Sequence, residues 1–131
     1  MEDYKVTLRR LALRDDRYID ELLRGERAST VLSGLAPKEH ALARVASLIA
    51  VDAAAPSFMS AVQAGLDAGL TEEEIVGTLI AVMPIVGVAR VVSAAPNLAL
   101  ALGYDVAEAF EAVADDPQQS RIPPRGADTW Q

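Results

Sequence analysis

The side chains best suited to chemistry in this sequence are one histidine and two arginines. His40 is the only histidine, and Glu39 precedes it directly. Imidazole changes charge near neutral pH, so this pair is a candidate acid and base; alternatively, His40 is a polar residue in the exposed first turn of a helix. Arg44 and Arg90 stand in largely apolar stretches. A buried guanidinium needs a carboxylate, which either a ligand or the protein can supply.

Three further positions are weaker candidates for a ligand site. Ser57 and Ser60 can donate and accept hydrogen bonds, but no base stands one helical turn away, so neither is predicted to be an activated nucleophile. Their alternative reading is two polar positions on the outer face of a helix. Met83 precedes Pro84, which removes a backbone hydrogen bond and can shape a pocket. The simpler reading of Met83 is a core residue.

Neither thiol nor metal chemistry is expected. The chain has no cysteine, which excludes disulfides, thiolate metal sites and thiol peroxidase activity within it. Three consecutive carboxylates, Glu72 to Glu74, fill the first turn of a predicted helix, where negative charge favours the helix dipole. Without histidine or cysteine nearby, they are not predicted to bind a metal. No cofactor is expected.

Composition favours a small domain made of helices. The chain has 131 residues, of which 51% are hydrophobic and only 5% aromatic, and closely packed helices suit such an alanine-rich core. The net charge of −7, without a run of basic residues, makes binding to nucleic acid or an anionic membrane unexpected. The charged amino-terminal stretch does not resemble a secretory signal, so a cytoplasmic location is the default expectation.

Periodicity and capping signals predict where the helices lie. Residues 5–24 are helical, in one or two pieces, and residues 25–30 break the pattern. A second helix begins at Pro37. A third ends at Gly69, and Thr71 with Glu74 forms a capping box flanked by a Leu70–Ile75 staple. The expected apolar faces are Leu42, Val45, Ala46 and Ile49 on the second helix and Phe58, Ala61, Val62, Gly65 and Leu66 on the third.

Residues 75–102 are almost entirely apolar, with Arg90 as their only charge. A membrane hairpin is one reading, because a span needs about 20 apolar residues. The charge at Arg90 and the prolines Pro84 and Pro96 favour instead a deeply buried helix pair in a soluble protein. Helices apolar on all sides also indicate a partner subunit. A short helix is expected at 106–114. The domain prediction is therefore one all-α domain over 1–114, followed by a Pro-rich tail over 115–131.

The stretch 37–102 resembles the carboxymuconolactone decarboxylase and alkylhydroperoxidase D-like family. The similarity lies in "LAPKEHALARVASLIA", in "AVQAGLDAGLTEEEIVGTLIAVMPIVGVARVVSA", and in their order. The positions that fit the family pattern are Gly69, Thr71, Glu73, Glu74, Ile75 and Gly87. The resemblance implies an all-α bundle of about six helices, assembled into trimers or hexamers with sites near subunit interfaces.

The family's signature residues are missing. The Cys-x-x-Cys pair of peroxidase members falls at Ala54 and Ser57, the histidine at Ala61 or, if the spacing shifts, at Ser60, and the preceding glutamate near Ala41. Two hypotheses follow from this loss. The first is a protein that binds or transforms a small organic acid or lactone by non-redox chemistry, with decarboxylase-like or isomerase-like activity. The second is a catalytically silent member that serves as an assembly or regulatory subunit.

Overall fold

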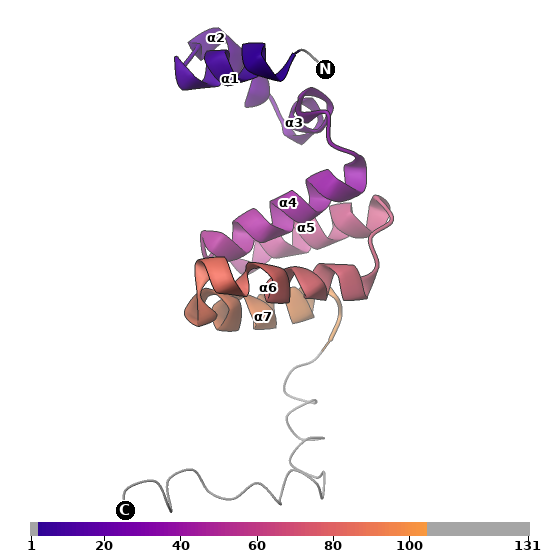
Figure 1. Ribbon diagram of the computed structural model, residues 1–131. Helices are drawn as coiled ribbons and strands as arrows, with labels where there is room; N and C mark the ends of the chain where they lie inside the picture. Colours follow the sequence, from indigo (N-terminus) through magenta and orange to yellow (C-terminus); the bar gives the residue numbers. More distant parts are fainter. Residues whose placement is uncertain (1–2, 105–131) are drawn as a thin grey trace, which may run out of the picture.

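The computed structural model, which describes residues 3–104, consists of α-helices without a strand in that range (Figure 1). Four helices form a bundle: α4 (Pro37–Ala50), α5 (Ala55–Asp67), α6 (Glu72–Val86) and α7 (Val88–Ala101). Consecutive helices α4 and α5 pack together, as do α6 and α7. The bundle closes because α5 packs on α7 and α4 on α6. The all-α prediction is therefore confirmed for these residues.

The core of the bundle lies between these four helices. Its largest fully buried side chains are Phe58, Ile49, Ile75, Leu98, Val45 and Val62. The predicted faces are largely confirmed, since Val45 and Ile49 of α4 and four of the five named residues of α5 are buried. Leu66 is the exception, with 36% of its surface exposed. On α4, Ala41 is also buried, whereas the predicted Leu42 and Ala46 are only partly buried.

The turn between α5 and α6 follows the sequence prediction closely. Gly69 has a φ of 94°, a left-handed conformation that favours glycine, and the Leu70 amide donates to the Gly65 carbonyl. Thr71 Oγ1 accepts from the Glu74 amide at 3.1 Å, and the Glu74 carboxylate accepts from the Thr71 amide at 3.0 Å. Leu70 and Ile75 are both buried beside this cap. The capping box and its staple are confirmed.

This cap should make stability depend on pH. Hydrogen bonding to the Thr71 backbone lowers the pKa of Glu74 below its usual 4.5. Hydrogen bonding to the Thr71 side chain lowers this pKa further. Because the pKa is lowered on folding, the stability that the Glu74 carboxylate contributes is complete above pH 4.5. This contribution is lost as the pH falls through the pKa of Glu74 in the folded protein. Glu74→Gln should therefore lose less stability than the wild type when urea unfolding is compared at about pH 6 and about pH 3.

The matched control for this prediction is Glu73→Gln, which removes a carboxyl from the same helical turn but leaves the Thr71–Glu74 box intact. It should keep the acid sensitivity that the cap produces. If both variants respond to acid as the wild type does, another group is the source of the pH dependence.

The amino-terminal segment forms three short helices that lie outside the bundle (Figure 1). Residues 5–24 divide into α1 (Tyr4–Ala12) and α2 (Asp16–Leu22), so the two-piece reading is confirmed. The predicted break at residues 25–30 is wrong beyond Gly25, because α3 (Glu26–Ser33) begins there. Serine and threonine are weak helix formers in isolation, but α3 ends on a left-handed Gly34 and packs on α4.

The apolar run 75–102 forms α6 and α7, and the chain turns between them at Gly87 rather than at either proline. Pro84 lies inside α6 and Pro96 inside α7. Deep burial is wrong for the outer face of the pair: the residues most exposed there are Ile80 at 71%, Ile85 at 85%, Val88 and Val92 at 63% and Leu100 at 64%. Only the inner face packs within one chain.

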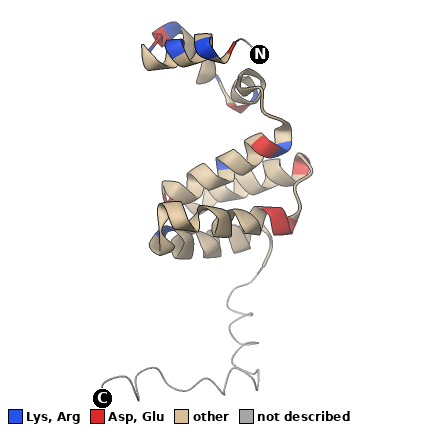
Figure 2. Ribbon diagram, in the orientation of Figure 1, with Lys and Arg blue, Asp and Glu red and all other residues tan. Residues whose placement is uncertain are grey.

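Charged residues gather on α1, α2 and the beginnings of α4 and α6, while most of the remaining bundle lacks them (Figure 2). Over residues 3–104, no helix has the length and apolar character required to cross a bilayer. The predicted helix at 106–114 and the tail at 115–131 lie outside the described residues.

Candidate functional site

Two neighbouring cavities lie where α3 meets the bundle. The larger, of about 560 Å³, is walled by residues of α2, α3 and α4, and the smaller, of about 140 Å³, by residues of α3, α4 and α5. Glu26, His40 and Arg44 line both cavities. His40 and Arg44 are one helical turn apart on α4, so the helix presents both side chains on the same side.

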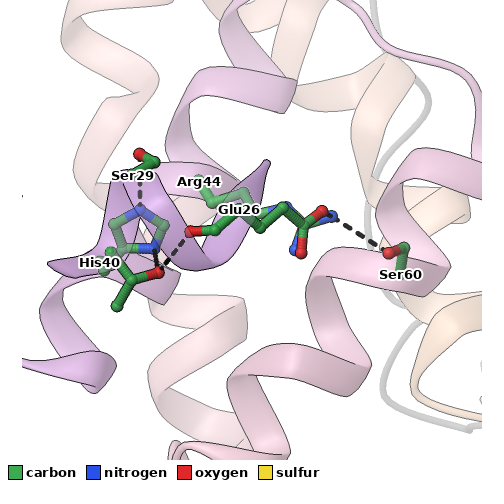
Figure 3. A network of polar contacts seen from close by, with 6 residues as sticks. Glu26, Ser29, His40, Arg44 and Ser60 are labelled. Carbon is green, nitrogen blue, oxygen red and sulfur yellow. Dashed lines mark hydrogen bonds and ion pairs between the residues drawn. The ribbon is translucent and has the colours of Figure 1, made fainter. Parts of the chain in front are cut away.

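Arg44 links three helices at this place (Figure 3). Its Nη2 lies 2.7 Å from Oε1 of Glu26 on α3 and donates to Oγ of Ser60 on α5 at 3.1 Å. The Arg44 side chain is 21% exposed, whereas that of Glu26 is 67% exposed. The Arg44 side chain is thus mostly covered by the protein, while the carboxylate that balances its charge remains accessible to solvent. Of the two predicted partners for Arg44, a ligand or a protein carboxylate, the structure shows the protein carboxylate of Glu26.

His40 contacts α3 instead of its sequence neighbour Glu39 (Figure 3). Its Nε2 lies 3.2 Å from Oγ of Ser29, and its Nδ1 lies 3.5 Å from Oγ1 of Thr30. The Glu39 carboxylate accepts from the Ala36 amide at 3.3 Å, which places it at the beginning of α4. The predicted partnership of Glu39 with His40 is therefore not formed, and His40 is partly buried rather than exposed.

Arg90 lies far from this group, where α7 begins near the end of α4. Its Nη1 is 3.6 Å from Oδ2 of Asp52, whose Oδ1 accepts from Ser93 at 2.7 Å. The side chains of Arg90 and Asp52 are 48% and 44% exposed. The expectation of a buried Arg90 is wrong here, because about half of its side chain stays exposed in a single chain. Arg90 lines neither of the two cavities.

The remaining candidates divide between the site and the core. Ser57 and Ser60 are both exposed and line neither cavity, but Ser60 accepts a hydrogen bond from Arg44 and so belongs to the site. Met83 is partly buried and packs against the core cluster. Ala41 and Ala61, the positions that the family resemblance pairs with a glutamate and a histidine, are 5% and 0% exposed. Both belong to the hydrophobic core cluster, so apolar packing occupies these positions.

Sequence reasoning missed Glu26, Ser29 and Thr30, because residues 25–30 were predicted to interrupt the helices. A signal was nevertheless present. Gly25 and Gly34 bound a stretch of helical length, and Glu26, Ser29 and Thr30 within it have the i, i+3, i+4 spacing of one helix face. Within residues 3–104, no group of three or more metal-binding side chains is arranged to hold a metal.

Over residues 3–104, these features define an all-α structure with a cavity beside a four-helix bundle, in which Arg44, His40 and Ser29 interrupt a largely apolar wall. No protein-family model matches the chain, and no curated protein or solved structure is significantly similar to it.

Proposed function

We propose that this protein binds a small organic acid or lactone in the cavity between α3 and α4, and that any reaction there is non-redox. The observation that carries the proposal is Arg44, a mostly buried cation that lines the cavity beside hydroxyl groups and an imidazole. A planar guanidinium binds carboxylates through paired hydrogen bonds. The cavity volume of about 560 Å³ lies within the range of small-molecule sites.

A ligand carboxylate can replace Glu26 as the partner of Arg44. The Glu26 carboxylate is 67% exposed, so water can solvate it when it leaves Arg44. A ligand carboxylate that replaces Glu26 would keep the guanidinium paired, and no charge would be left buried alone. The ligand would also lie near Ser29 and His40, which line the same cavity.

We also propose that the chain is a member of the carboxymuconolactone decarboxylase and alkylhydroperoxidase D-like family without its redox chemistry. The support is the order of α4, α5 and α6, which begin and end where the resemblance over 37–102 expects them. The alanines at positions 41 and 61 agree with the loss of the family's usual chemistry.

The test is a binding titration of the full chain with small neutral and anionic ligands. Acetate, succinate and γ-butyrolactone are suitable probes, followed by calorimetry and by NMR signals of the His40 ring. We expect saturable binding for at least one of the anionic probes, with chemical-shift changes at His40. Unchanged His40 signals at millimolar concentrations of every probe would refute the proposed cavity site.

A second candidate function, an assembly subunit, is favoured by the outer face of α6 and α7. Ile80 and Ile85 are 71% and 85% exposed on helices that carry few polar residues. Apolar surface of this kind marks protein interfaces. We therefore propose that the chain forms a homo-oligomer, with the trimer or hexamer of the resembling family as the expected size.

Light scattering should accordingly give a mass that is a multiple of 13.9 kDa at micromolar concentration. The double variant Ile80→Asp, Ile85→Asp should reduce that mass to one chain, because it places charge on a face that must lose water on association. A wild-type mass of 13.9 kDa would refute the oligomer. Assembly without any ligand binding in the titration above would favour this second function.

A further inference from the structure

The hydrogen bonds around His40 determine which ring nitrogen carries the proton. Thr30 Oγ1 donates to the Glu26 carbonyl oxygen at 2.8 Å, so its single hydroxyl hydrogen is already used. In its contact with His40 Nδ1 at 3.5 Å, Thr30 must therefore accept, which puts the hydrogen on Nδ1. The other nitrogen, Nε2, then has a free lone pair, and it can accept the hydroxyl hydrogen of Ser29 at 3.2 Å.

From this geometry we infer that Ser29 is a nucleophile activated by His40, with Thr30 as the residue that positions the imidazole. The inferred activity is hydrolysis of small esters or lactones. A serine hydroxyl needs an adjacent base to attack a carbonyl, and a base needs a third group to orient it. Ser29 is in the position of the nucleophile, His40 in that of the base and Thr30 in that of the orienting group; Figure 3 shows Ser29 beside the His40 ring.

Both reacting groups face open space. Ser29 and His40 line the cavity of about 560 Å³, so a small substrate can reach them. Arg44 lines the same cavity, one turn after His40 on α4. The substrate class is thus an ester or lactone that also carries a carboxylate. The preference for a carboxylate rests on the proposed function of Arg44. The inferred role of the Ser29–His40 pair does not depend on that proposal.

The reaction balances with water as the only co-reactant. Ser29 Oγ forms a bond to the substrate carbonyl carbon while its proton passes to His40 Nε2. The ester C–O bond then breaks, and the alkoxide leaving group takes the proton from His40. Water attacks the resulting acyl-serine, again giving a proton to His40, which returns it to Ser29 Oγ as the acid is released. For a lactone, the leaving alkoxide remains part of the same product molecule.

The alternative role of the Ser29–His40 bond is to tie α3 to α4 without chemistry. The full-length protein treated with diethyl p-nitrophenyl phosphate, a neutral reagent that phosphorylates activated serines, separates these roles. We expect p-nitrophenol release, with the phosphoryl group located on Ser29 by peptide mass spectrometry. His40→Gln keeps a hydrogen-bond partner for Ser29 but supplies no base, and labelling should slow roughly 100-fold or more.

Two control pairs sharpen the result. Ser47 also lies in the cavity wall, but its hydroxyl donates to the Ala43 carbonyl at 2.7 Å, so Ser47→Ala should be labelled on Ser29 as fast as the wild type. Ser29→Ala should not be labelled. Thr30→Val should slow labelling, and Thr30→Ser, which keeps the hydroxyl, should restore it. If Thr30 were only structural, Thr30→Val and Thr30→Ser variants of equal thermal stability would be labelled at the same rate.

Two results would overturn the inference: no phosphoryl group on Ser29 of the wild type, or equal labelling rates in wild type and His40→Gln. Because the first is read on the unaltered protein, it holds even if a variant does not fold. The Arg44 proposal fails or survives separately, because it is tested by carboxylate binding to the wild type, whereas labelling of Ser29 by this neutral reagent involves no carboxylate.

Discussion

Replacement of Phe58 by alanine is expected to lower the free energy of unfolding by about 3–5 kcal/mol. Phe58 is fully buried and is the largest side chain in the core cluster, which joins α4, α5, α6 and α7. Its loss removes the transfer free energy of the ring and leaves a cavity that neighbouring side chains fill only in part. Domains of this size are commonly stable by about 5–15 kcal/mol, so the variant should approach the limit of folding.

Urea unfolding followed by circular dichroism measures this loss. Met59→Ala is the matched control, because Met59 is the next residue on α5 and is 57% exposed. Its effect on the free energy of unfolding should stay within about 0.5 kcal/mol. Equal losses in the two variants would mean that α5 does not present Phe58 to the bundle core, and the packing described above would then be incorrect.

Arg44→Met is expected to weaken binding of a small carboxylate by about 2–5 kcal/mol, or roughly 30-fold to several thousand-fold. The reason is the low exposure of the Arg44 side chain, 21%, which reduces the competition from water for a bound ligand. Methionine keeps much of the length and apolar contact of the arginine stem but removes the charge. Calorimetric titration with the acid that binds the wild type best gives the comparison.

Stability should change much less than binding in Arg44→Met. The partner Glu26 is 67% exposed and becomes hydrated when the arginine is absent, so the loss of this ion pair should cost about 1 kcal/mol. A large fall in thermal midpoint would show that Arg44 is principally a structural link between α3, α4 and α5.

Arg90→Met is the control for the binding measurement. Arg90 resembles Arg44 in having a carboxylate partner, Asp52, but it lines neither cavity near α3. It should bind the acid as the wild type does. If Arg90→Met loses binding and Arg44→Met retains it, the ligand site lies near the start of α7 and the proposed cavity is wrong.

Local interactions explain why several features were predictable from the sequence. The capping box uses two residues three positions apart, Thr71 and Glu74, and needs no contact from elsewhere in the chain. Pro37 has its φ set by its own ring, and the left-handed turn at Gly69 depends on the absence of its own side chain. The periodic faces of α4 and α5 similarly follow from helix geometry alone.

The candidate site was decided by tertiary structure. The sequence contained Arg44 and His40 but could not show that Glu26, Ser29 and Thr30 meet them, because these residues lie 10 to 18 positions earlier on a helix that forms against α4. Serine and threonine contribute little helix propensity, so the existence of α3 depends on that packing.

The sequence also did not predict which charged side chains and which apolar helix faces are exposed. Arg90 stands in an apolar run and was therefore expected to be buried, yet its side chain is 48% exposed and pairs with Asp52, just after the end of α4. Hydrophobicity indicates how strongly a side chain prefers to leave water, but which of those side chains a single chain can cover depends on how its helices pack. That is why composition was enough to predict the helices of residues 3–104, while the folded arrangement decided which polar groups meet and which apolar face remains open.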